Sequence, residues 1–237
     1  MRPKPTGTTS DTAKIVERQM RNWEFARAQQ LESEAESRRP EVLDFIAISR
    51  TAGSGGHEVA TLLGERLNWP VFDHEILHAM AGDDQVRAQL YQKLDERDVS
   101  WLEGTLRALI RGEFRKEDYF HRLTETILAL ARRGYSIFLG RGADLILPRD
   151  RGLRIRITAS PERRAERFAL RSNITGALAL AEVERMDRER AEFRRRHFGP
   201  HANAATCYDL TVNVDRIRVD EAVELILLAL RIRGIAG

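Results

Sequence analysis

A chain of 237 residues with a formal net charge of +3 and a single cysteine excludes several classes of protein. The lone Cys207 cannot form an internal disulfide or a zinc cluster, and no apolar run reaches the roughly 20 residues that cross a bilayer. The first residues also lack the apolar region of a secretion signal. We therefore expect a cytoplasmic protein without a membrane partner, with one main α/β domain over residues 41–237.

The basic residues are almost all arginines. All but four of the 39 are arginines, and they are dense between residues 149 and 196. Arginine suits bidentate contacts with phosphate groups, which makes nucleic acid and small nucleotides the competing partners. Glutamates are interleaved in the same stretch and would repel a nucleic-acid backbone. The pattern therefore favours small-molecule nucleotides.

Residues 1–40 form an N-terminal arm that differs from the rest of the chain. The arm opens with Pro, Gly, Thr and Ser and continues as a polar, charged stretch. Within it, residues 12–36 have a helix-forming composition but only a thin apolar stripe, which consists of Ile15, Met20, Trp23 and Phe25. This composition favours a mobile or helical arm that packs on a partner or on a second copy of the chain.

A glycine-rich turn follows the first apolar run. The Ile-rich stretch from Asp44 to Arg50 has the length of a strand, and a helical pattern begins after the turn. The turn itself reads Gly53-Ser54-Gly55-Gly56-His57. Glycines let the backbone bend so that successive N–H groups point inward, and the following helix adds its positive dipole end. The turn thus predicts an anion-binding nest, with a plain strand-to-helix turn as the alternative.

The turn matches an ordinary nucleotide-binding loop only in part. That loop opens on a glycine and places Lys and then Ser or Thr directly after its last glycine. This chain has Arg50 at the opening position, and it has Gly56 and His57 in place of the lysine and the hydroxyl.

The middle of the chain continues with alternating elements. Trp69–Asp73 predicts a short strand that ends in an acid, and helical patterns run from His74 to about Arg111. We expect residues 75–115 to form a helical segment that covers a substrate, or else ordinary helical packing. A strongly periodic helix is predicted over Tyr119–Arg133.

The second half repeats the pattern. Strands are predicted at 135–139, 153–158 and 208–213, and the first runs straight into Gly140-Arg141-Gly142. Ser160 and Pro161 have the residue types of a helix start. The helix from Pro161 and a second one over 177–196 form a lid-like, arginine-rich pair over about residues 160–200, and a last helix is predicted over 219–232.

Strands that alternate with helices predict a parallel sheet covered on both faces, with ligand groups at the carboxyl ends of the strands. Four charged residues fall at those ends: Arg50, Asp73, Arg141 and Asp215. Their convergence predicts a functional site there.

Six segments together resemble the cytidylate-kinase-like family of the P-loop nucleoside monophosphate kinases. They occur in the family's order: Ile48–Ala60, Val71–Ile76, Phe138–Ala143, Ile157–Arg167, Asp187–Ala191 and Tyr208–Asn213. The resemblance spans about residues 43–232 and belongs to a branch with a Gly-Gly variant of the loop. It implies a P-loop NTPase-type parallel sheet with helices on both faces.

The resemblance also implies an activity and a set of site residues. The activity is transfer of a phosphoryl group from ATP, with Mg²⁺, to a nucleoside monophosphate such as CMP. Donor-nucleotide contacts fall on Arg50, Gly53, Ser54, Gly55, Gly56, His57, Arg163 and Arg167. Acceptor contacts fall on Asp73 and Arg141, and the catalytic arginines on Arg141, Arg188 and Arg190. Such chemistry relies on positioning and charge neutralisation, which arginines supply. No metal ligand is assigned.

The departures from the family pattern indicate an alternative function. Cytidylate kinases keep the loop lysine and hydroxyl, and they have an acid that reads cytosine where this chain has Gly142. Arg50, a lid arginine, Lys93 or Lys116 would have to replace the missing lysine. Without such a replacement, the chain would be a non-catalytic nucleotide-binding or sensing module that acts through its N-terminal arm.

Overall fold

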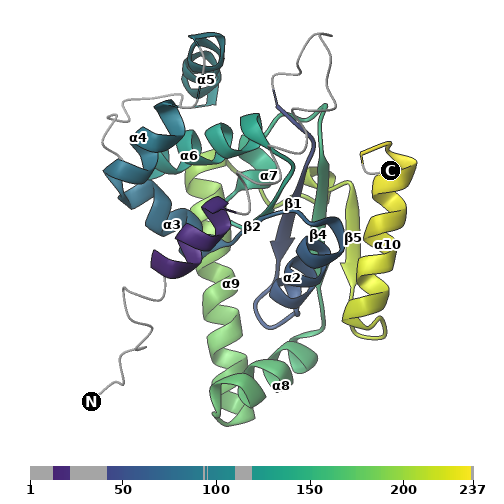
Figure 1. The fold of residues 1–237 in the computed structure, drawn as a ribbon. Coiled ribbons are helices and arrows are strands. Elements are labelled where there is room, and N and C mark those ends of the chain that lie inside the picture. Colours follow the sequence, from purple (N-terminus) through teal and green to yellow (C-terminus); the bar gives the residue numbers. More distant parts are fainter. Residues whose placement is uncertain (1–12, 22–41, 93, 95, 110–118, 236–237) are drawn as a thin grey trace.

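The computed structural model describes residues 13–21, 42–92, 94, 96–109 and 119–235 (Figure 1). In this part of the chain, five parallel strands form one sheet in the order β2-β3-β1-β4-β5. The strands are β1 (Phe45–Arg50), β2 (Val71–Phe72), β3 (Ser136–Leu139), β4 (Leu153–Thr158) and β5 (Leu210–Asn213). This arrangement confirms the predicted α/β fold with a parallel sheet.

Helices connect the strands and cover the sheet. They are α2 (Gly56–Leu67), α3 (His74–Gly82), α4 (Asp84–Gln92), α5 (Glu96–Leu109), α6 (Tyr119–Arg133), α7 (Ala143–Ile146), α8 (Pro161–Ser172), α9 (Gly176–Phe198), the 3₁₀ turn η1 (Ala205–Cys207) and α10 (Val219–Ile232). The predicted helical segment of residues 75–115 corresponds mainly to α3, α4 and α5, and its end lies outside the described residues. No helix among the described residues combines the length and the apolar character needed to cross a bilayer.

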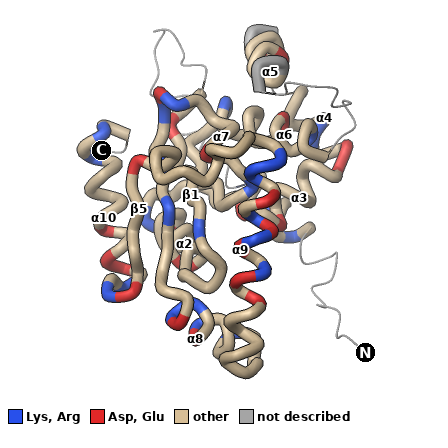
Figure 2. The backbone as a smooth tube through the Cα atoms, turned by 180° about the vertical axis from the view of Figure 1, so that it is seen from behind, with Lys and Arg blue, Asp and Glu red and all other residues tan. Residues whose placement is uncertain are grey.

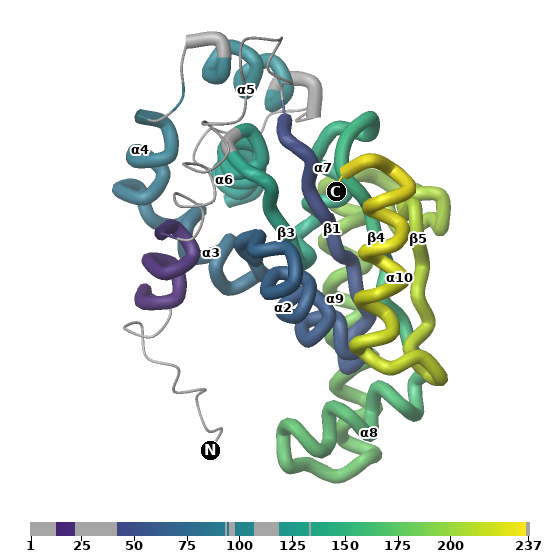
Figure 3. The backbone as a smooth tube through the Cα atoms, turned by 45° about the vertical axis from the view of Figure 1, so that its right-hand side comes forward, coloured from purple at the N-terminus to yellow at the C-terminus, as the bar shows by residue number. Residues whose placement is uncertain are grey.

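Two apolar cores lie on the two faces of the sheet. Successive strand residues point to opposite faces. Phe45 and Phe138 therefore join the core formed with α3, α6 and α7, whereas Ile46 and Ile137 join the core formed with α2 and α10. Figure 3 shows α2 and α10 on one side of the strands and α9 on the other. Burial on both faces explains why β1 is a continuous apolar run rather than an alternating one.

The strand order places a crevice at the carboxyl ends of β1 and β3. The chain leaves β1 toward β2 at one edge of the sheet, and it leaves β3 toward β4 in the opposite direction. Ligands of open α/β sheets bind where neighbouring strands diverge in this way. The glycine turn follows β1 and the Gly140-Arg141-Gly142 turn follows β3, so both predicted loops border the crevice.

Helices α8 and α9 pack against each other as a hairpin, and α9 is the long helix that runs back from α8 (Figure 2). The start of α8 differs from the predicted side-chain cap, because Ser160 makes no side-chain cap bond. Its backbone N–H instead donates to Oδ1 of Asp215 at 2.8 Å. Asp215, expected among the ligand groups, thus holds the start of α8.

The described part of the N-terminal arm packs on its own chain. Residues 13–21 are helical, and Val16 is buried in the core that contains Ile76 and Met80 of α3. Met20 packs against the same core, whereas Ile15 is exposed. The rest of the predicted apolar stripe, Trp23 and Phe25, lies outside the described residues.

Candidate active site

The glycine turn between β1 and α2 is tight, and two of its glycines have left-handed backbone conformations. Gly53 and Gly55 have φ values of +75° and +82°, which side chains rarely adopt. A Cβ atom on Gly53 would also collide with the carbonyl oxygen of Arg164. The side chain of Ser54 is turned into the interior, where its hydroxyl donates to the carbonyl oxygen of Thr51 at 2.8 Å. The first N–H groups of α2 have no partner within the helix and carry its positive dipole end.

Helices α8 and α9 hold this loop in place. Nη1 of Arg167 donates to the carbonyl oxygen of Ser54 at 3.1 Å. The carboxylate of Asp187 accepts the N–H of Ala52 at 2.8 Å and pairs with Arg164. The predicted lid pair is therefore in contact with the loop.

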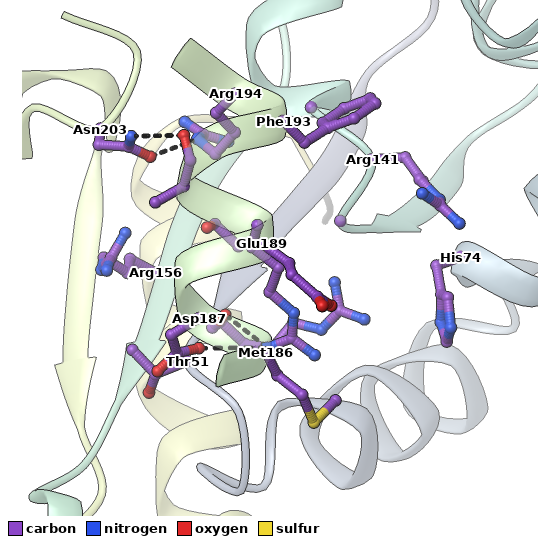
Figure 4. Close-up of a pocket in the computed structure, with 16 residues that line it drawn as sticks. Thr51, His74, Arg141, Arg156, Met186, Asp187, Glu189, Phe193, Arg194 and Asn203 are labelled. Atoms are coloured by element: carbon purple, nitrogen blue, oxygen red, sulfur yellow. Dashed lines mark hydrogen bonds and ion pairs between the residues drawn. The ribbon is translucent and has the colours of Figure 1, made fainter. Parts of the chain in front are cut away.

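A pocket of about 480 Å³ opens beside the loop, at the carboxyl ends of β1 and β3 (Figure 4). Its charged lining consists of Arg50, Arg141, Arg156, Arg190, Arg194, Asp187 and Glu189. In Figure 4, Arg141 and His74 lie on one side of α9, and Arg156 and Asn203 lie on the other. The volume suits a small ligand, and the lining holds more arginines than carboxylates.

Two of these arginines have hydrogen-bond partners on the protein, and for one of them the partner is a carboxylate. Arg194 of α9 makes a two-bond pair with the buried Asp144 of α7, at 2.7 and 2.8 Å. Arg156 of β4 donates from Nη1 to the hydroxyl of Tyr208 at 3.0 Å. The hydroxyl is neutral, so Arg156 keeps its charge. The rest of the excess positive charge of the pocket lies with Arg50, Arg141 and Arg190, although Nη1 of Arg190 lies 3.6 Å from Oδ1 of Asp187.

These three arginines act on one another electrostatically. Burial, and then the charges of Arg190 and Arg141, lower the pKa of Arg50 to about 9 against the opposing effect of Asp73. Burial also lowers the pKa of Arg190, with Arg141 and Arg164 adding to the effect and Asp187 opposing it. An anion among them would relieve this repulsion.

The charges of the same three arginines also act on His74, the first residue of α3. Its pKa is lowered to about 4 by burial first and by the Arg50 charge next. The imidazole is therefore neutral at pH 7.

Arg141 sits in a strained turn and is incompletely satisfied. Its φ is +53°, between the left-handed Gly140 and Gly142. Within the described part of the chain, its buried Nε has no hydrogen-bond partner, and the same holds for Oγ1 of Thr51 on the pocket wall. A strained backbone with unsatisfied polar atoms is typical of a ligand site.

Four other predicted site residues do not line the pocket. Asp73 caps α3 by accepting the N–H groups of Glu75 and Ile76 at 3.0 Å, and its Oδ2 lies 3.9 Å from Nδ1 of His57. His57 is more than half exposed. The side chain of Arg188 is 65% exposed, 3.9 Å from Glu184, and that of Arg163 is 61% exposed, 3.4 Å from Glu166. Arg141 and Arg190 line the pocket, whereas neither Arg163 nor Arg188 does.

The structure adds His74 to the site, although the sequence pattern showed it only as a helix start. For Asp187 the sequence left open a metal-side acid or a salt-bridge partner, and the structure pairs it with Arg164. In β4, arginines alternate with apolar residues at 154 and 156. That alternation was a signal that both point to one face, but Arg154 makes structural bonds to carbonyl oxygens, including that of Asp144 at 2.9 Å.

The donor set fits Mg²⁺ brought by a nucleotide rather than an ion held by the protein alone. Among the described residues, no three His, Cys, Asp or Glu side chains gather as metal ligands. Mg²⁺ keeps several waters and commonly takes one or two carboxylates together with phosphate oxygens. Asp73, beside the start of α2, would be such a carboxylate.

The sheet, the glycine turn and the helix pair over it define an α/β protein with a nucleotide-kinase-like fold. The sequence matches the profile of the cytidylate kinase-like family over residues 45–216. Since the match covers more than half of the chain, the protein belongs to this family, as the resemblance predicted. A sequence comparison with curated proteins gave no match.

One of three similar solved structures has a TM-score that shows a shared fold. An uncharacterized protein from Eubacterium ventriosum is similar with a TM-score of 0.61 and 21% identity, over 79% of this chain and 98% of that chain. TT1252 from Thermus thermophilus has a TM-score of 0.45 and 20% identity, over 80% and 98%. Shikimate kinase from Bacteroides thetaiotaomicron has a TM-score of 0.44 and 16% identity, over 79% and 98%.

Proposed function

We propose that this protein transfers a phosphoryl group from ATP, with Mg²⁺, to the phosphate of a nucleoside monophosphate, and that the acceptor is CMP-like. The observation that carries the proposal is the group formed by Arg50, Arg141 and Arg190. These arginines line one pocket beside the glycine loop, and Arg50 and Arg190 have lowered pKa values. A phosphate group in that pocket would neutralise them.

The two sites would divide the reaction between them. The loop and the start of α2 would hold the donor phosphates through backbone N–H groups. Arg141 would hold the acceptor phosphate, with Arg190 beside it. An oxygen of that phosphate attacks the γ-phosphorus, the bond from phosphorus to the bridging oxygen breaks, and its electron pair leaves with ADP. Arginines stabilise the charge of the transferring group.

The arginines of α8 and α9 differ in whether this structure brings them to the proposed site. Arg167 already contacts the loop, so its proposed role at the donor needs no change in the hairpin. Arg163 and Arg188 point to solvent, so their proposed roles require an arrangement of α8 and α9 different from this one.

The choice of CMP follows the family. His74, Met186 and Phe193 give the pocket a flat and apolar component on which a base would pack. Gly142 leaves the reading of the base to other groups, and the acceptor panel below tests which base is preferred.

One observation favours the alternative, a nucleotide-binding or sensing module without turnover. The only lysine among the described residues is Lys14, in the N-terminal helix, and Lys93 and Lys116 lie outside the described residues. A catalyst of this design must therefore use arginine where ordinary loops use lysine.

A coupled assay tests the proposal. Wild-type protein is incubated with ATP, Mg²⁺ and each of CMP, dCMP, UMP, AMP and GMP, and ATP binding is titrated in parallel. We expect turnover with a pyrimidine monophosphate and a loss of about 10²–10³ in kcat/KM for Arg141→Ala. Arg231→Ala, an exposed arginine on α10, is the matched control. ATP binding without turnover on any acceptor would support the sensing module instead.

A further inference from the structure

Gly56 stands where an ordinary nucleotide-binding loop has its lysine, and the structure shows what fills that space. A Cβ atom on Gly56 would lie 2.7 Å from Cβ and 3.0 Å from Cγ of Arg50. Its three nearest neighbours all belong to the Arg50 side chain. The positions of both Cβ atoms are fixed by the backbone, so no side-chain rotation can relieve the contact between them. Any side chain at position 56 is therefore incompatible with the present course of Arg50.

The other end of Arg50 rests against a second glycine. Its Nη1 donates to the carbonyl oxygen of Leu139 at 3.3 Å. A Cβ atom on Gly140 would overlap Nη1 and lie 3.1 Å from Cζ. The Arg50 side chain thus starts at the end of β1, passes Gly56 and ends at Gly140, and it lines the same pocket as Arg141 and Arg190.

We propose that Arg50 supplies the cation that a lysine at position 56 supplies in ordinary loops, so that the cation and the glycine have exchanged places. In the ordinary pattern a glycine opens the loop and a lysine follows its last glycine. In this chain an arginine opens the loop and a glycine stands in the lysine's place. This inference rests on the proposed function, and it makes Arg50 a catalytic residue that lies between the donor loop and the acceptor pocket.

The electrostatics agree with this role. A pKa of about 9 leaves Arg50 protonated at pH 7, and the repulsion from Arg190 and Arg141 is relieved when a polyphosphate arrives. Arg164 and Arg167 of α8 also reach the loop, where they donate to the carbonyl oxygens of Ala52 and Ser54. Neither of them lines the pocket, whereas Arg50 does.

A stability cycle tests the geometry without any assay of activity. Gly56→Ala in the wild-type protein should lower Tm by about 5 °C, because the new Cβ overlaps Arg50. The same substitution in an Arg50→Gly background should change Tm by less than about 1 °C, since all three close neighbours are then gone. An equal loss of Tm in the two backgrounds would contradict the claim that the Arg50 side chain occupies the space of a side chain at position 56.

Turnover and binding test the exchange of charge. Arg50→Gly should lower kcat by about 10²–10³, and Arg50→Gly/Gly56→Lys should regain at least about tenfold over Arg50→Gly. Titration of Mg·ATP should show the same order of affinities. A single variant within threefold of wild type, or a folded double variant without any gain in turnover or affinity, would overturn the role of Arg50. If wild type turns over no acceptor, the proposed function fails, and the titration alone then decides the inference.

Discussion

The two faces of α9 carry similar residues and have different environments. Asp187, Arg190 and Arg194 recur at helical spacing and face the sheet, where they contact the loop, the pocket and Asp144. Arg185 and Arg188 point to solvent and pair with glutamates of the same helix. The difference shows that the contacts of each guanidinium determine whether an arginine belongs to a site. The number of arginines in a helix does not.

The largest effect should come from the buried end of the inner face. Arg194→Ala leaves the carboxylate of Asp144 buried and unpaired, which should lower the free energy of unfolding by about 3–5 kcal/mol. Urea denaturation monitored by circular dichroism measures it, with the exposed Arg196→Ala as control. A loss below about 1 kcal/mol would show that the pair is not a structural element.

A kinetic comparison of Arg190 and Arg188 comes next. Arg190→Ala should reduce kcat/KM by about 10²–10³, because the guanidinium lines the pocket and donates to the carbonyl oxygen of Arg50. Arg188→Ala should have an effect at least about tenfold smaller in the same assay, since its side chain is exposed. An equal loss for both variants would mean that α9 presents another face to the substrate during turnover.

A smaller effect is expected from His74. Its pKa is about 4 in the folded protein and near 6.5 when unfolded, so the unfolded state binds the extra proton between these values. Stability contributed by the neutral imidazole is therefore present above about pH 6.5 and declines as the pH falls toward 4. Tm should drop between pH 7 and pH 5, and His74→Asn should reduce the drop. An unchanged drop in the variant would contradict the assigned field of Arg50, Arg141 and Arg190.

The smallest effect should come from the outer face. The side chain of Arg185 is 49% exposed and pairs with Glu182 and Glu189, so salt and water screen its charge. Arg185→Ala should leave Tm within about 1 °C of wild type. A clear loss in a thermal scan would show that the glutamates depend on this arginine to tolerate one another.

Much of the fold followed from the sequence because its signals are local. The boundaries of β4, α6 and α10 agree with the predicted 153–158, 119–133 and 219–232. The short α7 was missed, because Gly140-Arg141-Gly142 reads as a turn and four helical residues leave no periodic pattern.

The sequence predicted the site only where glycines mark its turns. Glycines marked the turns that hold Arg50 and Arg141. They did not tell which arginines of α9 face inward, because Ala179 and Val183 are the only buried apolar residues described in that helix. A stripe this short fixes no face over the following turns. The contact between Gly56 and Arg50 joins two ends of a loop, so spacing alone does not show it.

The most direct test of the central claim compares the affinities of CMP and cytidine by calorimetric titration. In the proposed function, the pocket recognises a phosphate through Arg50, Arg141 and Arg190. CMP should therefore bind at least about tenfold more tightly than cytidine, and Arg141→Ala should abolish that difference while the protein stays folded. Equal affinities in wild type, or a difference that survives in Arg141→Ala, would contradict the account.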